Sequence, residues 1–215
     1  MSLADYVAEN SERLVFLTVQ HVEIVLLSVG LATVIAVAAA VLTERSPRVR
    51  SVLLSVTGTL LTIPSFALFG LLIPIVGLGL VPTTLALTTY AIFPILRNTV
   101  TGLEEVDPGV VDAAQGIGMG VWRRLFLVRL PLAWPVILNG VRVATIMVVA
   151  IAAIGAAVRG PGLGELIFRG LARIGGANAL NEVLAGVLGV MLVALVLDII
   201  FLLITKLTTP RGLHV

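Results

Sequence analysis

The stretch VDAAQGIGMGVWRRLFLVRLP, residues 111–131, is a polar interruption in an otherwise apolar chain. It contains one aspartate, three arginines and three separated glycines. Of the 215 residues of the whole sequence, 59% are hydrophobic and only 12% are charged, and the mean hydropathy is +1.14. Long apolar runs with so little charge predict transmembrane helices. We therefore expect the quoted stretch to lie outside the membrane.

Five apolar stretches are each long enough to cross a bilayer, which takes about 20 helical residues. Their approximate ranges are 24–42, 52–76, 83–100, 136–158 and 183–207. Pro64 and Pro74 are expected to interrupt the second stretch, and Pro94 the third. The prediction is an all-α polytopic membrane protein, in one domain over 1–215 with its core at about 20–207. Five spans place the two termini on opposite sides.

The distribution of positive charge predicts the orientation of these spans. If the loop after the first span is cytoplasmic, nine basic residues lie inside: Arg45, Arg48, Arg50, Arg97, Arg123, Arg124, Arg129, Lys206 and Arg211. Four then lie outside: Arg13, Arg159, Arg169 and Arg173. The positive-inside rule thus predicts an outside N-terminus, a cytoplasmic C-terminus and a cytoplasmic loop 103–131. The acidic N-terminal segment lacks the positive region of a cleaved signal peptide.

The residue pattern of the polar loop predicts two short helices around a turn. Asp107-Pro108 is a helix start, because aspartate caps a helix and proline suits its first position. Apolar residues then recur at helical spacing, at Val110, Ala114, Ile117, Val121, Leu125 and Val128. Gly116, Gly118 and Gly120 indicate the turn, and Pro131 is expected to end the second helix. Such a hairpin either lies on the bilayer surface or docks into a groove of a partner.

The loop resembles the cytoplasmic loop of permease subunits of ATP-binding-cassette (ABC) importers. That family's motif is Glu-Ala-Ala, three residues, Gly, nine residues, Ile-x-Leu-Pro. Here the corresponding residues are Asp112, Ala113, Ala114, Gly118, Val128, Leu130 and Pro131. Aspartate replaces glutamate and valine replaces isoleucine. The resemblance implies the type I ABC importer permease fold, with this loop as the coupling helix that inserts into a separate ATPase subunit.

Three further stretches, 62–79, 90–108 and 160–170, resemble permeases for osmoprotectants such as glycine betaine, choline and carnitine. Permeases of methionine or other amino-acid importers are the nearest alternative. No aromatic cage for a quaternary ammonium group is visible, so the resemblance assigns substrate selection to an extracytoplasmic binding protein. The loop 160–181 would face that protein, with Arg159, Arg169 and Arg173 as contacts or as merely solvated residues.

No energy source is visible in the chain itself. The phosphate-binding loop GxxxxGK[ST] needs a lysine after a glycine loop, and the only lysine is Lys206 in TKLTTP. ATP and Mg²⁺ are therefore expected in a partner ATPase, and the chain is not expected to be an enzyme. Since no internal repeat supplies a second half of a path, a second copy or a similar chain is required. The location implied is a bacterial or archaeal cytoplasmic membrane.

Composition excludes other classes of function. The chain has no cysteine, so disulfides, thiol catalysis and cysteine metal sites are absent. A net charge of +2 does not predict a nucleic-acid surface. An intramembrane hydrolase would need a pairing such as Ser65 with His21, since His214 lies in the tail. Neither that reading nor a passive channel explains the loop motif, and Ser65 suits a helix cap better than a nucleophile.

Two charged residues lie within predicted spans. Arg142 and Asp198 sit at similar depths, roughly 12–16 Å from the cytoplasmic interface at a rise of 1.5 Å per residue. Matched depth and opposite sign predict an intramembrane ion pair between the fourth and fifth spans. The alternative is that Arg142 extends to the inner surface while Asp198 binds backbone or water.

Five residues of the second and third spans are candidates for the translocation path or its gate. Pro64, Ser65 and Pro94 lie where prolines release backbone carbonyls and bend helices. Prolines also occur simply as packing kinks. Tyr90 and Asn98 are eight residues apart and share a helix face, so we expect them to line the path. Asn98 could equally lie at an interface near the cytoplasmic end.

Overall fold

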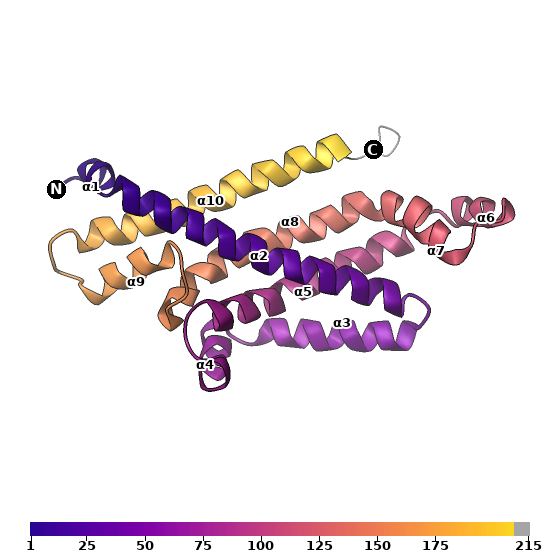
Figure 1. Cartoon of the computed structure of the whole chain (residues 1–215), viewed down its shortest axis with the longest axis horizontal. Coiled ribbons are helices and arrows are strands. Elements are labelled where there is room, and N and C mark those ends of the chain that lie inside the picture. Colours follow the sequence, from indigo (N-terminus) through magenta and orange to yellow (C-terminus); the bar gives the residue numbers. More distant parts are fainter. Residues whose placement is uncertain (209–215) are drawn as a thin grey trace.

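In the computed structural model, which describes residues 1–208, the chain is built from helices alone (Figure 1). The α-helices are α1 Leu3–Glu9, α2 Ser11–Thr43, α3 Pro47–Thr62, α4 Ser65–Val76, α5 Leu80–Glu104, α6 Pro108–Gly116, α7 Val121–Arg124, α8 Leu130–Ile154, α9 Gly164–Ala172 and α10 Ala179–Thr208. A π-helical turn, η1 Leu125–Arg129, joins α7 to α8, and a 3-10 turn, η2 Gly155–Val158, follows α8. The all-α prediction is confirmed.

Four helices of the described part are long and apolar enough to cross a membrane: α2, α5, the continuous run 121–158 that contains α8, and α10. The predicted second span is not one straight helix. It is the pair α3 and α4, bent by 98° at the break between them. With this broken pair counted as one span, the number of spans is five.

The break follows from Pro64. A residue before proline is disfavoured in the α conformation, and Ile63 is accordingly extended, with φ −64° and ψ 127°. The Ile63 carbonyl accepts a hydrogen bond of 2.7 Å from the hydroxyl of Tyr90 on α5. The other two predicted interruptions are wrong, because Pro74 lies inside α4 and Pro94 inside an unbroken α5. Tertiary packing holds α5 helical through its proline, since α2, α3, α4 and α8 all contact it.

The centre of the bundle is formed by α2, α5 and α8. Small side chains fill these contacts, including Ala32, Ala36, Ala91, Ala144 and Ala152, all almost completely buried. Association of helices within a membrane depends on van der Waals packing, and small residues let the backbones approach closely. By contrast α3 buries none of its residues within the chain, and α4 buries only Phe69.

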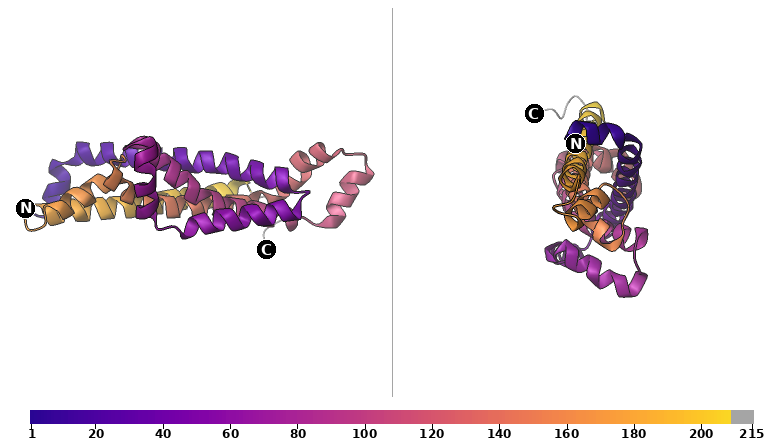
Figure 2. Two further views of the ribbon diagram at one scale, coloured as in Figure 1. Left: turned by 90° about the horizontal axis from the view of Figure 1, so that it is seen from below. Right: turned by 90° about the vertical axis from the view of Figure 1, so that its left-hand side faces the viewer.

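The long helices run lengthwise, and the molecule has two distinct ends (Figures 1 and 2). We call the end that carries α6 and α7 the loop end, and the end that carries α1 and α9 the opposite end. Of the nine basic residues predicted to be inside, seven lie in loops or terminal helix turns at the loop end, Arg97 lies about two turns before the end of α5, and Arg211 lies outside the described residues. The first helix and the end of α10 lie at opposite ends, as an odd number of spans requires.

The predicted end of the second loop helix is also wrong. The chain runs through α7, η1 and α8 without interruption, and Pro131 lies in the first turn of α8. The wider π-helical turn explains this: the Leu130 amide bonds to the Leu125 carbonyl, five residues back. A π-turn shifts the hydrogen-bond register just before Pro131, whose missing amide would otherwise break the α-helical ladder.

Candidate functional site

The loop between α5 and α8 begins as predicted at Asp107. Its carboxylate accepts a 2.7 Å hydrogen bond from the amide of Gly109, and Pro108 occupies the first position of α6. The cap satisfies an amide that the helix leaves free. The predicted start of a short helix at this point is confirmed.

Gly118 ends α6 in a left-handed conformation, with φ +83°. Its amide donates to the Gln115 carbonyl at 2.9 Å, and the amide of Met119 donates to the Ala114 carbonyl at 3.1 Å. These two bonds form a Schellman motif, in which the residue after the cap must adopt positive φ. Only glycine does so without steric cost, which is the physical reason for a glycine at this position of the motif.

The helix α6 stands clear of the long helices and packs against α7 and η1 (Figure 2). Of its motif residues only Ala114 is buried, whereas Asp112 and Ala113 are exposed. Ile117, just after the helix, is 76% exposed. The loop therefore presents a short helix whose apolar stripe is mostly uncovered within the chain.

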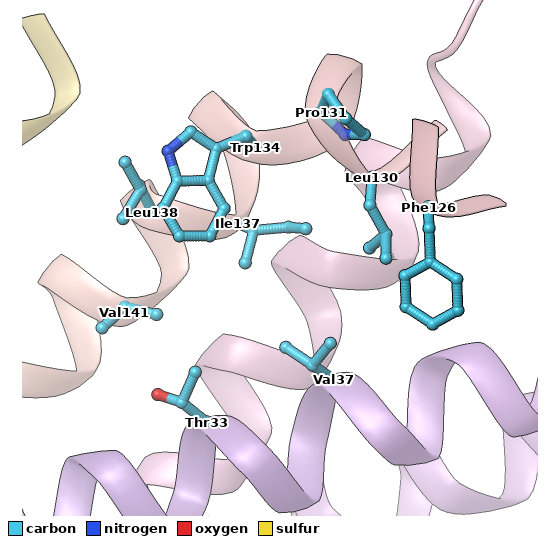
Figure 3. Close-up of a pocket in the computed structure, with 9 residues that line it drawn as sticks. All are labelled: Thr33, Val37, Phe126, Leu130, Pro131, Trp134, Ile137, Leu138 and Val141. Carbon is cyan, nitrogen blue, oxygen red and sulfur yellow. The ribbon is translucent and has the colours of Figure 1, made fainter. Parts of the chain in front are cut away.

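The returning arm of the loop forms one wall of an apolar groove of about 460 Å³. Leu130 and Pro131, the last two motif residues, lie on this wall with Phe126 and Trp134, and α2 supplies Val37 opposite (Figure 3). Trp134 also ties the arm to α10, because its indole Nε1 donates to Thr208 Oγ1 at 3.0 Å. These motif residues thus shape the joint between the loop and the bundle.

The structure brings Arg142 and Asp198 together. Arg142 Nε lies 2.6 Å from Asp198 Oδ1, and its Nη2 lies 3.0 Å from Oδ2. The guanidinium and carboxylate therefore meet in the two-point geometry that makes such pairs strong. The contact joins α8 to α10, and both side chains are about three-quarters covered.

The five path candidates are distributed over two places. Pro64 and Ser65 lie at the break between α3 and α4, where Tyr90 is buried and bonded to the Ile63 carbonyl. The predicted capping role of Ser65 is wrong, since α4 has no side-chain cap and Pro64 occupies the cap position.

Asn98 lies elsewhere, at the crossing of α5 and α8. Its Nδ2 donates to the Pro94 carbonyl at 2.8 Å. A Cβ atom added to Gly140 of α8 would meet Asn98 Cβ at 2.6 Å and the Pro94 carbonyl oxygen at 3.0 Å. Asn98 and Pro94 therefore belong to a tight helix contact, and their role in a path stays a prediction.

At the opposite end, one of the three arginines expected to face a binding protein has an internal partner. Arg169 on α9 forms an ion pair with Glu182 on α10. Arg159 and Arg173 are exposed, and Arg159 adopts φ +61° in the turn after η2. Among the described residues, no group of three or more His, Asp or Glu side chains is placed to hold a metal ion.

Two residues of the loop end were missed by reasoning from the sequence. Arg129 on η1 and Glu44 at the end of α2 form an ion pair. From the sequence, Arg129 is only one of the positive charges expected in the cytoplasm, and Glu44 has no assigned role. No spacing in the sequence connects positions 44 and 129, so only the packing of α2 against α8 reveals the contact.

Comparison with known proteins agrees with this arrangement. The family described as "Binding-protein-dependent transport system inner membrane component" matches residues 32–210. The chain belongs to this family. It is thus a permease of the ABC importers, and the resemblance seen in the loop motif is confirmed.

Among curated proteins, the permease is 38% identical over 219 residues to the osmoprotectant import permease protein OsmW of Salmonella typhimurium, with 100% of both chains covered. It is 32% identical to the glycine betaine/carnitine/choline transport system permease protein OpuCB of Bacillus subtilis, over 97% of this chain and 94% of that one.

The permease fold is also found among solved structures. An inward-facing structure of the MetNI methionine ABC transporter matches with a TM-score of 0.79 and 25% identity, over 92% of this chain and 96% of that one. The type I ABC importer permease fold is thereby confirmed.

Proposed function

We propose that this permease imports a small quaternary-ammonium osmoprotectant such as glycine betaine, choline or carnitine. The observation that carries the proposal is the similarity to OsmW and OpuCB along essentially the whole chain. It extends through all the spans and the loop, so it includes the helices that would line a path. Import of a methionine-like amino acid is the second candidate, since the MetNI transporter shares the fold at 25% identity.

The loop 103–131 is the element that receives work from a separate ATPase, which binds ATP and Mg²⁺. An exposed helix with an uncovered apolar stripe needs a partner surface, because exposed apolar area is costly in water. Asp112 and Ala113 lie on the accessible part of α6, Ala114 and Gly118 hold its shape, and Leu130 and Pro131 join it to the bundle.

The loop end faces the cytoplasm, and the N-terminus lies outside. The concentration of arginines at the loop end supports this orientation, because cytoplasmic loops are enriched in Lys and Arg. A binding protein then delivers substrate at the opposite end, where Arg159 and Arg173 are exposed.

A second permease chain completes the path. The support is the poor burial of α3 and α4, which leave apolar side chains such as Val56 and Leu71 uncovered within one chain. The break at Pro64-Ser65 lies in this uncovered pair, held to α5 by Tyr90. A gate at this break would change the angle between α3 and α4 as the transporter alternates between outward- and inward-facing states.

Reconstitution tests the substrate class. The permease is assembled in proteoliposomes with the ATPase and binding protein encoded beside it, and uptake of labelled glycine betaine, carnitine, choline and methionine is measured with ATP inside. We expect ATP-dependent uptake of at least one quaternary-ammonium compound and none of methionine. Uptake of methionine alone would replace the first candidate with the second, and uptake without ATP would contradict both.

A further inference from the structure

Arg129 connects the two ends of the loop 103–131 where they meet the bundle, a region that we call the base of the loop. Arg129 lies on η1, where the loop returns to the bundle, and its Nη2 donates to the Leu103 carbonyl at 2.8 Å. Leu103 lies in the last turn of α5, where the loop departs. One guanidinium therefore joins the two arms of the loop across 26 residues of chain.

The same guanidinium connects the loop to the first span. Its Nη1 forms an ion pair with Glu44, the residue that caps the C-terminal end of α2. Both side chains are largely covered, with 19% of Arg129 and 26% of Glu44 exposed. Because the planar guanidinium offers donors in several fixed directions, it binds a carboxylate and a carbonyl at once, which a lysine ammonium does less well.

An apolar cluster lies at the same joint. Leu103 of α5, Leu125 of η1 and Ala133 and Ile137 of α8 are buried together, with Val37 and Val41 of α2 packed against them. The cluster joins α2, α5, η1 and α8, and the Arg129 contacts join three of these elements, α2, α5 and η1. Position 129 is the unspecified residue of the Ile-x-Leu-Pro part of the loop motif, so the motif itself assigns it no role.

We propose that Arg129 is a positioning residue that fixes the base of the loop to the first span, so that movement of α6 reaches α2 together with α5 and α8. The inference rests on the proposed coupling of α6 to an ATPase. Without Arg129, α6 still docks on the ATPase, because its exposed face and its caps are unchanged. The movement of α6 then displaces the base of the loop without moving α2, and ATP is hydrolysed with less transport.

The test compares Arg129→Gln and Arg129→Lys in the complete transporter in proteoliposomes. Three quantities are measured: association with the ATPase, ATP hydrolysis, and substrate molecules imported per ATP. We expect association and hydrolysis to persist, and import per ATP to fall about tenfold, within the range of coupling between sites. Arg129→Lys keeps the charge but should recover only part of the loss.

A matched control breaks another ion pair at the loop end. Arg50 of α3 lies 2.6 Å from Glu104 of α5, and within the described part of the chain no hydrogen bond or ion pair joins either side chain to the returning arm of the loop. Arg50→Gln should therefore leave import per ATP near the wild-type value. An equal fall in Arg50→Gln and Arg129→Gln would contradict a specific role for Arg129.

Cross-linking positions 44 and 129 distinguishes a positioning role of Arg129 from a role in folding. The natural chain contains no cysteine, so the thiols introduced by Glu44→Cys and Arg129→Cys are the only ones in this chain. The double variant should import poorly per ATP, and a short bismaleimide joining the two thiols should restore import. Normal import per ATP in Arg129→Gln would overturn the proposal, as would cross-linking that leaves import low or abolishes it. Loss of ATPase association in α6 variants is a separate readout, so failure of the coupling proposal itself is distinguishable.

Discussion

Two short helices of nine residues, α6 at the loop end and α9 at the opposite end, differ in how the chain covers them. The helix α9 is held on two sides, by the ion pair of Glu165 with Arg13 on α2 and that of Arg169 with Glu182 on α10. Its backbone is also in close contact, since a Cβ atom on Gly164 would lie 2.0 Å from the Ala153 carbonyl oxygen. Among the described residues, α6 forms no ion pair, and it packs mainly against α7 and η1 of its own loop.

The two helices therefore find their partners in different places, α9 within the chain and α6 outside it. Gly164, Leu166 and Gly170 of α9 are buried against the bundle and both ion pairs are formed within the chain, so this helix is a fixed part of the bundle. The surface of α6 is left open, and its stability depends on its own caps and on whatever docks against it. An isolated helix of this length is marginal in water, which makes its glycine cap important.

The largest expected effect comes from disturbing that cap. Gly118→Val places a β-branched residue at φ +83°, where even an ordinary L-residue loses roughly 1–2 kcal/mol. The end of α6 should unwind, and the affinity for the ATPase should fall by about tenfold or more. Co-purification of the two subunits measures the effect.

Gly175→Val is the matched control, because Gly175 has φ +86° and open space around it but lies at the opposite end. It should carry the same backbone strain without changing ATPase association. An equal loss of ATPase association in both variants would contradict a specific role of α6 in binding the ATPase.

The next effect concerns the ion pair of Arg142 with Asp198, which joins α8 to α10. Arg142→Gln and Asp198→Asn each leave one charge without its partner between α8 and α10, and transport should fall strongly in both. The exchange Arg142→Asp with Asp198→Arg should recover part of the transport. If the exchanged protein transports no better than either single variant, transport does not depend on the contact between these two charges.

The two ion pairs of α9 should differ in strength because their burial differs. Glu182 is 7% exposed, so Arg169→Ala leaves a buried charge unpaired and should lower the free energy of unfolding by about 3 kcal/mol. The side chain of Glu165 is 53% exposed, and Arg13→Ala should cost less than about 1 kcal/mol. Thermal unfolding in detergent measures both, and equal effects would contradict the burial argument.

The smallest effect tests the contact of α5 with α8. Gly140→Ala forces a methyl group against Asn98 and should cost about 1–3 kcal/mol. Gly30→Ala on α2 has open space and should be neutral or slightly stabilising, by up to about 1 kcal/mol. A neutral Gly140→Ala would show that this crossing is looser than the structure indicates.

Much of this architecture is readable from the sequence because its causes are local. Apolar runs predict the spans, and Asp107-Pro108 and the three loop glycines predict the ends of α6. The matched depths of Arg142 and Asp198 follow from helix rise alone, and the structure brings the two side chains into contact.

The features that the sequence does not predict depend on packing between distant segments. The effect of a proline is one example: Pro64 breaks its helix where Tyr90 binds the freed carbonyl, while Pro94 stays within α5 between neighbouring helices. The π-helical turn before Pro131 and the contact of Arg129 with Glu44 are others. For the prolines and for the Arg129–Glu44 pair, a contact with a segment far away in the sequence decides the outcome, and no local pattern predicts it.

Site-specific photo-cross-linking from Ala113 tests directly whether α6 docks on the ATPase subunit. A photoreactive residue at this exposed position of α6 is activated in membranes that contain the assembled transporter. We expect a covalent product with the ATPase subunit, and none from the same group placed at Arg173 at the opposite end. A product with the extracytoplasmic binding protein at position 113, or with the ATPase at position 173, would contradict it.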